Sequence, residues 1–425
     1  MPARLTICSG HDLSRMHTLI HSTMMMKWKT YCLAALFAVA FLCAASGQTL
    51  QLVLPSRTDT NITQFNNYHY LYLNTNVNVT ARPQLFVFLP GTGGAPSGYT
   101  DVLKTAANLG FPAIGLMYDD PNTMNSLCGH STNANAYQEA RLAVINGGTN
   151  SFNNGGTITS ISISTADSIT NRLVKLLLYL ATNNPSQNWT QYLSASVGLN
   201  WPQIIIAGHS QGAGHAGLIG KTQPVARSLM FADTDWWTPN GQLPGQPANW
   251  ITSPGVTAPE YFFGFVHTND PLILYPEEIA TWNGYGLPQF GGPLLVESNP
   301  APYFGSHEFT TGLTPQDGSN YHGATVVDSA TPLEPNGTPV YQPVWQFMMT
   351  GPPELPQLQI SLPVSNQVVV SFGTFTNCAY QIQTTTNLSS VWLNAGSPIA
   401  GDGTIKTNRF GRSNAVEFFR GSVQY

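Results

Sequence analysis

Residues 203–217, QIIIAGHSQGAGHAG, constrain the fold of this chain more than any other segment. The apolar run at 204–207 is typical of a strand buried on both faces of a sheet. It leads into Gly-His-Ser-Gln-Gly at 208–212, a G-x-S-x-G motif, and then into small residues that suit the start of a helix. Between a strand and a helix, this motif holds a serine on a strained turn with its hydroxyl exposed, and the glycines leave room for the turn. Ser210 is therefore the candidate nucleophile.

A nucleophilic serine also needs N–H donors for the negative oxygen that forms in its reaction. The apolar run 85–90 opens into Gly-Thr-Gly-Gly at 91–94, which is followed by a predicted helix at 99–110. We expect the backbone N–H groups of Thr92 and Gln211 to form the oxyanion hole. The loop fits neither of the glycine patterns that bind phosphate groups, so a nucleotide site is not expected here.

The acid is expected after the serine, at the end of a later strand. Asp270 directly follows the apolar run 260–268 and is the preferred candidate. Asp233 and Asp235 follow the run 228–231, one strand earlier, and are the alternatives. An aspartate at such a position is also commonly a helix cap or a turn residue.

The base should be a histidine that follows the acid in the chain. Of the ten histidines only His307 and His322 lie beyond Asp270. His322 stands in a loop before Gly323 and is the preferred base, whereas His307 directly precedes a predicted strand and is the alternative. The histidines near the motif, His209, His215 and His267, are interpreted as lining, packing or supporting residues.

The other segments alternate between strand-like and helix-like patterns, which predicts a mostly parallel sheet built from βαβ units. Residues 119–160 show no clear pattern and are predicted to form a long irregular excursion that faces the substrate. Strands are expected at 67–74, 85–90, 112–118, 203–209, 228–233, 260–268 and 308–313, and helices at 99–110, 166–183, from 211 onward and around 344–349.

With these residues in view, residues 48–351 resemble the α/β-hydrolase superfamily over about 300 residues. The resemblance implies a doubly wound, mostly parallel sheet and a serine hydrolase, most often an esterase or a lipase, with no cofactor and no metal. The chain departs from the pattern in two respects. Pro90 stands where many of these hydrolases have a histidine, and a helical lid is not evident.

The N-terminal region has the three parts of a secretory signal peptide at about residues 24–47. Lys27 and Lys29 precede an apolar run at 31–45, and small residues follow it. This run is shorter than the roughly 20 residues of a membrane-spanning helix. We expect translation to start at one of the methionines 24–26 and the mature protein to be secreted, periplasmic or held at the cell surface, without a stable membrane span.

The C-terminal region is predicted to be a separate module. Residues 352–357 are a Pro-rich linker, and 358–425 alternate between short apolar runs and turn residues, as in a small β-sandwich. The stretch YQIQTTTNLSSVWLNAGSPIAGDGTI, together with a final VEFFR, resembles modules at the C-terminus of exported bacterial proteins. The resemblance suggests a bacterial source, and the module is a candidate for binding a surface or a polymer.

Charge and cysteine content exclude several classes of protein. Charged residues are only 9% of the chain, and removal of residues 1–47, with four Lys/Arg and one Asp, would change the formal net charge from −5 to −8. Such an acidic protein is a poor candidate for binding nucleic acid. Cys128 and Cys378 are the only cysteines beyond the leader, and no motif supports a disulfide between them or a zinc site.

These features favour a secreted serine hydrolase that cleaves small or polymeric carboxylic esters through Ser210, His322 and Asp270. A polyester depolymerase, a carbohydrate esterase, and a lipase or peptidase on the same scaffold are alternatives within the enzyme class. The alternative from another class is a binding or adhesion protein that keeps the fold without its activity.

Overall fold

A computed structural model describes residues 47–425, apart from 234, 352–357, 365, 375–378, 403, 412–415 and 425. The predicted start site, the signal peptide up to residue 46, the Pro-rich linker and Cys378 therefore lie outside the described residues. Cys128 is buried as a free thiol.

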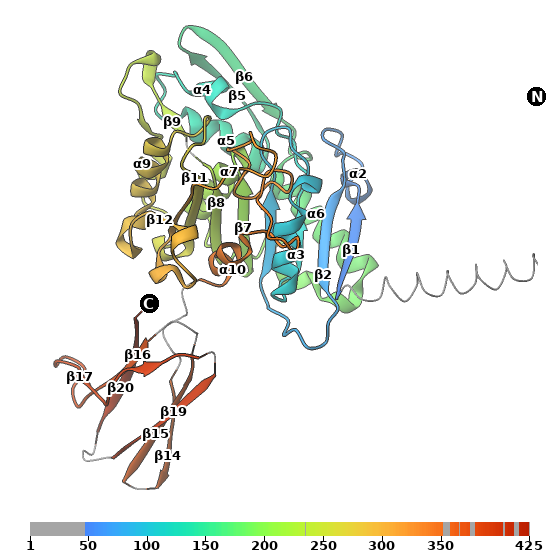
Figure 1. Ribbon diagram of the computed structural model, residues 1–425. Helices are drawn as coiled ribbons and strands as arrows, with labels where there is room; N and C mark the ends of the chain where they lie inside the picture. The colour runs from blue at the N-terminus through green and yellow to red at the C-terminus, as the bar shows by residue number, and fades with distance from the viewer. Residues whose placement is uncertain are drawn as a thin grey trace, which may run out of the picture. The chain divides into compact units, whose positions relative to one another are not determined.

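The main sheet of the described chain has nine strands in the order β1-β2-β4-β3-β7-β8-β11-β13-β12 (Figure 1). β2 runs antiparallel to its neighbours β1 and β4, and every other pair is parallel. The strands are β1 (Gln48–Val53), β2 (His69–Asn74), β3 (Leu85–Leu89), β4 (Ala113–Gly115), β7 (Ile204–His209), β8 (Arg227–Phe231), β11 (Phe262–His267), β12 (Leu294–Leu295) and β13 (Glu308–Thr311).

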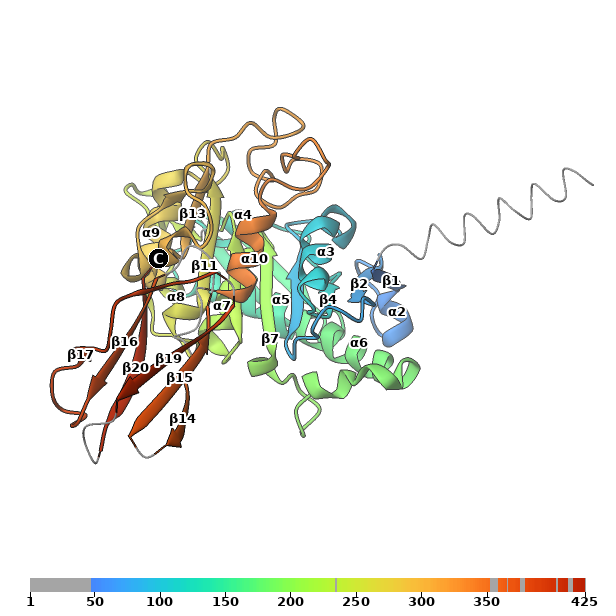
Figure 2. The same ribbon diagram turned by 60° about the horizontal axis from the view of Figure 1, so that its bottom comes forward.

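Both faces of this sheet are covered, because the side chains of each central strand alternate between two apolar clusters. In β3, Leu85, Val87 and Leu89 pack into the cluster that contains α5, α6, α7 and α9, whereas Phe86 and Phe88 pack into the cluster that contains α3 and α10. Here α10 lies beside α3 (Figure 2). The helices are α2 (Pro55–Thr58), α3 (Thr100–Asn108), α4 (Met124–Cys128), α5 (Ala136–Asn146), α6 (Ile169–Asn183), α7 (Gln211–Thr222), α8 (Asn249–Thr252), α9 (Tyr275–Tyr285) and α10 (Gln342–Thr350).

The prediction of an irregular excursion at 119–160 is wrong. The segment contains α4, α5 and a hairpin of β5 (Gly148–Asn154) and β6 (Thr157–Ile163). Gly155 and Gly156 have positive φ in the hairpin turn, a conformation that glycine adopts without strain. The strands were hidden because only one face of the hairpin is apolar, and α5 because a buried arginine interrupts its apolar face.

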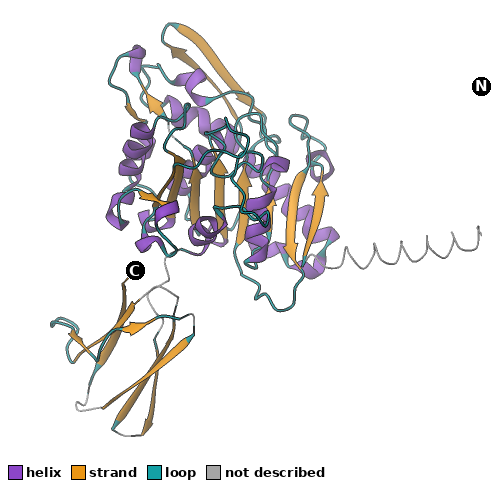
Figure 3. Cartoon of the chain, viewed as in Figure 1, coloured by secondary structure: helices purple, strands orange, loops and turns teal. Residues whose placement is uncertain are grey.

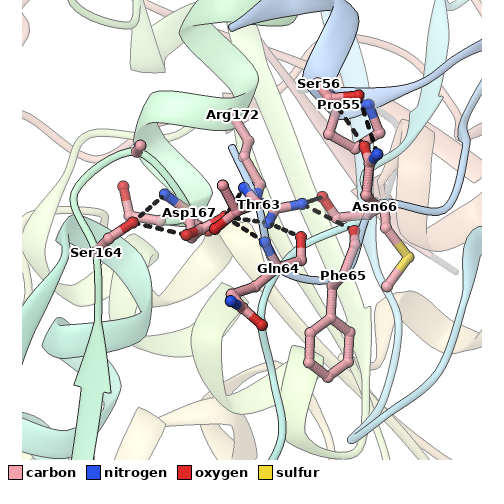
Figure 4. Close-up of polar contacts among 12 residues, drawn as sticks. Pro55, Ser56, Thr63, Gln64, Phe65, Asn66, Ser164, Asp167 and Arg172 are labelled. Carbon is pink, nitrogen blue, oxygen red and sulfur yellow. Dashed lines mark hydrogen bonds and ion pairs between the residues drawn. The ribbon is translucent and has the colours of Figure 1, made fainter. Parts of the chain in front are cut away.

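Buried ionic contacts attach the loop after α2 to the start of α6. One carboxylate oxygen of Asp167 accepts the backbone N–H groups of Thr63 and Gln64 at 3.0 and 3.1 Å (Figure 4). The same oxygen lies 2.8 Å from Nη2 of Arg172, whose Nη1 donates to the carbonyl of Phe65. The guanidinium therefore has acceptors for its buried N–H groups, as a buried charge requires.

The C-terminal residues form two antiparallel sheets and no helix within their described part (Figure 3). Side chains of both sheets share one small apolar core, which includes Val370, Phe372, Tyr380 and Ile382, so the module is a β-sandwich. One sheet contains β14 (Gln359–Val364), β15 (Gln367–Gly373) and β19 (Ile405–Gly411), and the other β16 (Ala379–Thr385), β17 (Leu393–Asn394), β18 (Ile399–Ala400) and β20 (Phe418–Gln424).

Candidate active site

Ser210 occupies a strained turn between β7 and α7. Its φ of 52° and ψ of −121° lie outside the regions that residues with a Cβ normally adopt, at a cost of about 1–3 kcal/mol. The N–H of Ser210 donates to the carbonyl of Phe231 on the neighbouring strand at 2.8 Å, which holds the turn in place. A Cβ on Gly208 would collide with the carbonyl of Gly212, and a Cβ on Gly212 with that of Leu89. Both glycines of the motif are therefore required by the close crossing.

His322 and Asp270 are joined by a hydrogen bond. Nδ1 of His322 lies 2.7 Å from Oδ2 of Asp270, whose side chain is buried. The other oxygen of Asp270 accepts the backbone N–H groups of Leu272 and Ile273 at 2.8 and 3.0 Å. A carboxylate can only accept, so Nδ1 carries the proton of the neutral ring and Nε2 is left without one. His322 is thus in the tautomer that can take up a proton at Nε2.

Ser210 and His322 line the same cavity, which has a volume of about 230 Å³. Among the hydrogen bonds of the described residues, none joins the Ser210 hydroxyl to His322. The two residues are related through the cavity that both of them line. The wall of the cavity includes Met124 and Asn125 of α4. The side chain of Gln211 fixes the position of this helix. Its oxygen accepts the backbone N–H of Met124, and its NH₂ group donates to the carbonyl of Asn122. The residue after the serine therefore holds one wall of the cavity.

Thr92 and Gln211, the predicted oxyanion donors, line this cavity too. Among the hydrogen bonds of the described residues, none uses the backbone N–H of either residue, whereas Gly93 and Gly94 on the same loop donate theirs to the carbonyls of Asp120 and Gly91. Two unoccupied N–H donors beside the serine are what an oxyanion hole requires.

The alternative acids lie at the cavity but do not reach the base. Asp235 forms two hydrogen bonds of 2.6 Å with Arg141 and accepts a third from Trp250, while Asp233 lies 3.5 Å from Arg141. Burial raises the pKa of Asp233 to about 7. No hydrogen bond or ion pair between the described residues connects Asp233 or Asp235 with His322. These two carboxylates face Arg141, a residue of α5 that was not predicted to belong to the site.

The alternative base is packed between aromatic rings and does not line this cavity. His307 is stacked between Phe263 and Phe290, with ring centroids 4.0 and 4.2 Å away, and its Nδ1 bonds to the carbonyl of Phe262. Burial lowers its pKa to about 4. His307 is therefore a packed core histidine, and it is not one of the residues that line the cavity.

His322 belongs to segment 312–341, which has turns and one isolated bridge but no helix or strand. Asp328 attaches this segment to the start of α3. Its carboxylate accepts the backbone N–H groups of Thr100 and Asp101 at 2.8 and 3.1 Å, together with the Thr100 hydroxyl. The indole N–H of Trp345 in α10 also donates to the carbonyl of Thr325 at 2.9 Å. These contacts hold the loop that presents His322.

Among the described residues, no group of three or more His, Cys, Asp or Glu is arranged to hold a metal ion. None of the described helices is both long and apolar enough to cross a bilayer.

A serine turn between a central strand and a helix of a mostly parallel sheet defines the α/β-hydrolase fold, as expected from the sequence. No family model matches the sequence, and no curated protein matches it either.

The chain is similar to solved structures. They include the acetyl xylan esterase from Aspergillus awamori (14% identity, 62% of this chain and 93% of that one, TM-score 0.31). Another is a bacterial heroin esterase (13% identity, 65% of this chain and 80% of that one, TM-score 0.30). A third is the protein TT1662 from Thermus thermophilus (12% identity, 62% of this chain and 88% of that one, TM-score 0.30).

Proposed function

We propose that this protein is an exported serine hydrolase that cleaves carboxylic esters, with Ser210 as nucleophile, His322 as base and Asp270 as its acidic partner. One observation carries the proposal: His322 is bonded through Nδ1 to buried Asp270 and lines the cavity in which Ser210 stands on its strained turn.

In the first half of the reaction, the Ser210 oxygen attacks the ester carbonyl while Nε2 of His322 takes the hydroxyl proton. The carbonyl oxygen becomes negative and accepts the N–H groups of Thr92 and Gln211. Asp270 remains ionised and stabilises the positive ring of His322. The tetrahedral intermediate then expels the alcohol, which receives the proton from Nε2, and the acyl group stays on Ser210.

In the second half, a water molecule attacks the acyl carbonyl and gives a proton to Nε2 of His322. The same two N–H groups stabilise the second negative oxygen. Collapse releases the carboxylic acid, and the Ser210 oxygen takes back its proton. The ring of His322 is neutral again and the Ser210 hydroxyl is restored at the end of the cycle, so the enzyme is ready for another ester.

The size and polarity of the cavity support a short acyl group. Its volume of about 230 Å³ is below the roughly 300–1,000 Å³ of sites that enclose drug-sized ligands. Polar and charged side chains, among them Asn125, Arg141 and Asp233, stand beside Met124, Leu272 and Ile273 in its wall. A long alkyl chain would have to cover these groups without hydrogen bonds, at a cost in free energy for each.

The signal peptide predicted at about 24–47 supports action outside the cytoplasm. The same machinery would cleave an ester in a polymer, and the C-terminal module is proposed to bind such a polymer or a surface. A polyester and an acetylated carbohydrate differ in the alcohol, so the products distinguish them.

Labelling with a fluorophosphonate probe, followed by mass spectrometry of the modified peptide, tests the nucleophile. We expect the label on Ser210 and none on the Ser210→Ala variant. Both proteins are then compared on 4-nitrophenyl esters from acetate to laurate, where we expect kcat/KM to be highest for the shortest acyl groups. A label on another residue, or full activity of Ser210→Ala, would overturn the mechanism, and a parent protein inactive on every ester would favour the binding-protein alternative.

A further inference from the structure

The imidazole of His209, next to the nucleophile, connects three separate parts of the site. His209 is the last residue of β7 and is 5% exposed. Its Nδ1 lies 3.0 Å from the hydroxyl of Tyr99, and its Nε2 lies 3.0 Å from the carbonyl oxygen of His322. The hydroxyl of Tyr99 in turn accepts the backbone N–H of Gly91 at 3.1 Å. The connection therefore runs from the glycine loop, through the end of the nucleophile strand, to the loop of the base.

Only one arrangement of protons satisfies all three contacts. The carbonyl of His322 can only accept, so Nε2 of His209 must carry a proton. Burial, together with the nearby His322, lowers the pKa of His209 to about 3, so the ring is neutral and its Nδ1 has no proton. The Tyr99 hydroxyl therefore donates to Nδ1. Burial raises the pKa of Tyr99 to about 12, so this hydroxyl keeps its proton.

The packing around this chain of hydrogen bonds leaves little freedom. A Cβ placed on Gly91 would lie 3.1 Å from Nδ1 of His209 and 3.3 Å from the Cβ of Ser210. The rings of His209 and His322 are 4.7 Å apart, and that of Tyr99 is 4.8 Å from Phe88. A shift of His209 would thus move the glycine loop or the base loop with it.

We propose that His209 is a positioning residue: it fixes the backbone of His322 directly and, through Tyr99, the glycine loop that presents the Thr92 N–H. This inference rests on the proposed function, and it assigns His209 no part in proton transfer. A neutral His209 adds no charge to the site, so it does not oppose the positive charge that His322 acquires during the reaction.

The substitution His209→Leu removes both hydrogen bonds at similar volume, whereas His209→Gln keeps an N–H donor near the Nε2 position. We expect His209→Leu to lower kcat on 4-nitrophenyl acetate by about 10- to 100-fold, because a misplacement of about 1 Å costs that much, and to leave KM within about threefold. We expect His209→Gln to recover most of the loss. Tyr99→Phe removes the bonds of the hydroxyl to Gly91 and to Nδ1 of His209 but leaves the bond between His209 and His322, so it should lower kcat by about three- to tenfold.

If His209 had only a structural role, His209→Leu would lower the melting temperature, but kcat would not fall separately from KM. His209→Gln would then not restore kcat. Normal kcat in folded His209→Leu would overturn the inference, and so would equal losses in the leucine and glutamine variants. If His209→Leu does not fold, Tyr99→Phe decides, and a normal kcat there refutes the connection.

A measurement independent of turnover separates this inference from the proposed function. Nitrogen NMR of ¹⁵N-histidine-labelled protein, assigned with His209→Gln, should show one ring that stays neutral with its proton on Nε2 from pH 5 to pH 9. Titration of His209 near its ordinary value of about 6.5 would refute the proton arrangement even in an active enzyme. If the parent protein is inactive on all esters, the catalytic part of the inference fails together with the function, while the NMR result still decides the geometry.

Discussion

Replacing Asp270 with asparagine tests the acid assignment, because the two oxygens of Asp270 have different partners. Oδ1 accepts the N–H groups of Leu272 and Ile273, and Oδ2 accepts Nδ1–H of His322. An asparagine has one oxygen, so it can serve only one of these sides. If its oxygen faces the backbone, its NH₂ group faces Nδ1 of His322, and the ring must move its proton to Nε2.

The structure decides between the two orientations of the asparagine. Turning the oxygen toward His322 would leave two partly buried N–H groups without acceptors, at about 1 kcal/mol each. The first orientation is therefore favoured by roughly 2 kcal/mol, and it places a proton on Nε2 of His322. Such a ring cannot take the proton of Ser210, so we expect kcat to fall by about 10³- to 10⁴-fold with KM nearly unchanged.

Steady-state kinetics on 4-nitrophenyl acetate measures this effect, and two matched variants control it. Asp167→Asn makes the same change at a buried carboxylate that also accepts two backbone N–H groups, so it should cost stability but little kcat. Asp233→Asn tests the rival acid and should lower kcat by less than about tenfold, since no hydrogen bond links it to the base. A larger loss in Asp233→Asn than in Asp270→Asn would refute the assignment.

Two further predictions concern stability. Gly212→Ala should destabilise the fold by several kcal/mol, roughly 3 or more, because the added Cβ collides with the backbone of Leu89. In the control variant Gly98→Ala the added Cβ meets open space, so this change should be neutral. The melting temperatures of the two variants test this, and an equal change in both would contradict the packing argument. His307, whose pKa is lowered to about 4, stays neutral in the fold but binds a proton in the unfolded chain below about pH 6.5. The folded state therefore binds fewer protons there, and this group alone should lower the free energy of unfolding by about 2 kcal/mol between pH 7.5 and pH 5. Urea unfolding of the parent and of His307→Gln measures it, and parallel pH curves for the two proteins would count against a neutral buried ring.

The sequence predicts the central strands well because parallel strands covered on both faces must be almost wholly apolar. The runs at 85–90 and 203–209 correspond to β3 and β7. The same reasoning fails for elements with one exposed face: β1 and the hairpin β5–β6 carry polar residues at alternate positions, which resemble a loop when the partner strand is unknown. The helix α9 was missed for the same reason, since its buried positions include Glu278.

For the candidate site, chain order and strand ends were enough to select residues that the structure brings together. Ser210 follows one strand, Asp270 another, and His322 was chosen because it lies in a loop after the acid. Arg141 and Tyr99 could not be selected in this way, because their roles depend on contacts with residues 94 and 110 positions away in the chain. A single sequence carries no local signal for such contacts.

The attachment of His322 through Asp328 has a consequence for inactivation by heat. Segment 312–341 owes its position to contacts with α3 and α10 and contributes no strand to the sheet. Segments with few regular backbone bonds open at a lower free energy than the sheet that carries them. Opening of this segment separates the base from Ser210 while the sheet persists, so turnover should cease at a temperature below the cooperative unfolding transition and return on cooling. Resistance to heating would then be set by this irregular segment, and it could be raised by stiffening the segment without any change to the core.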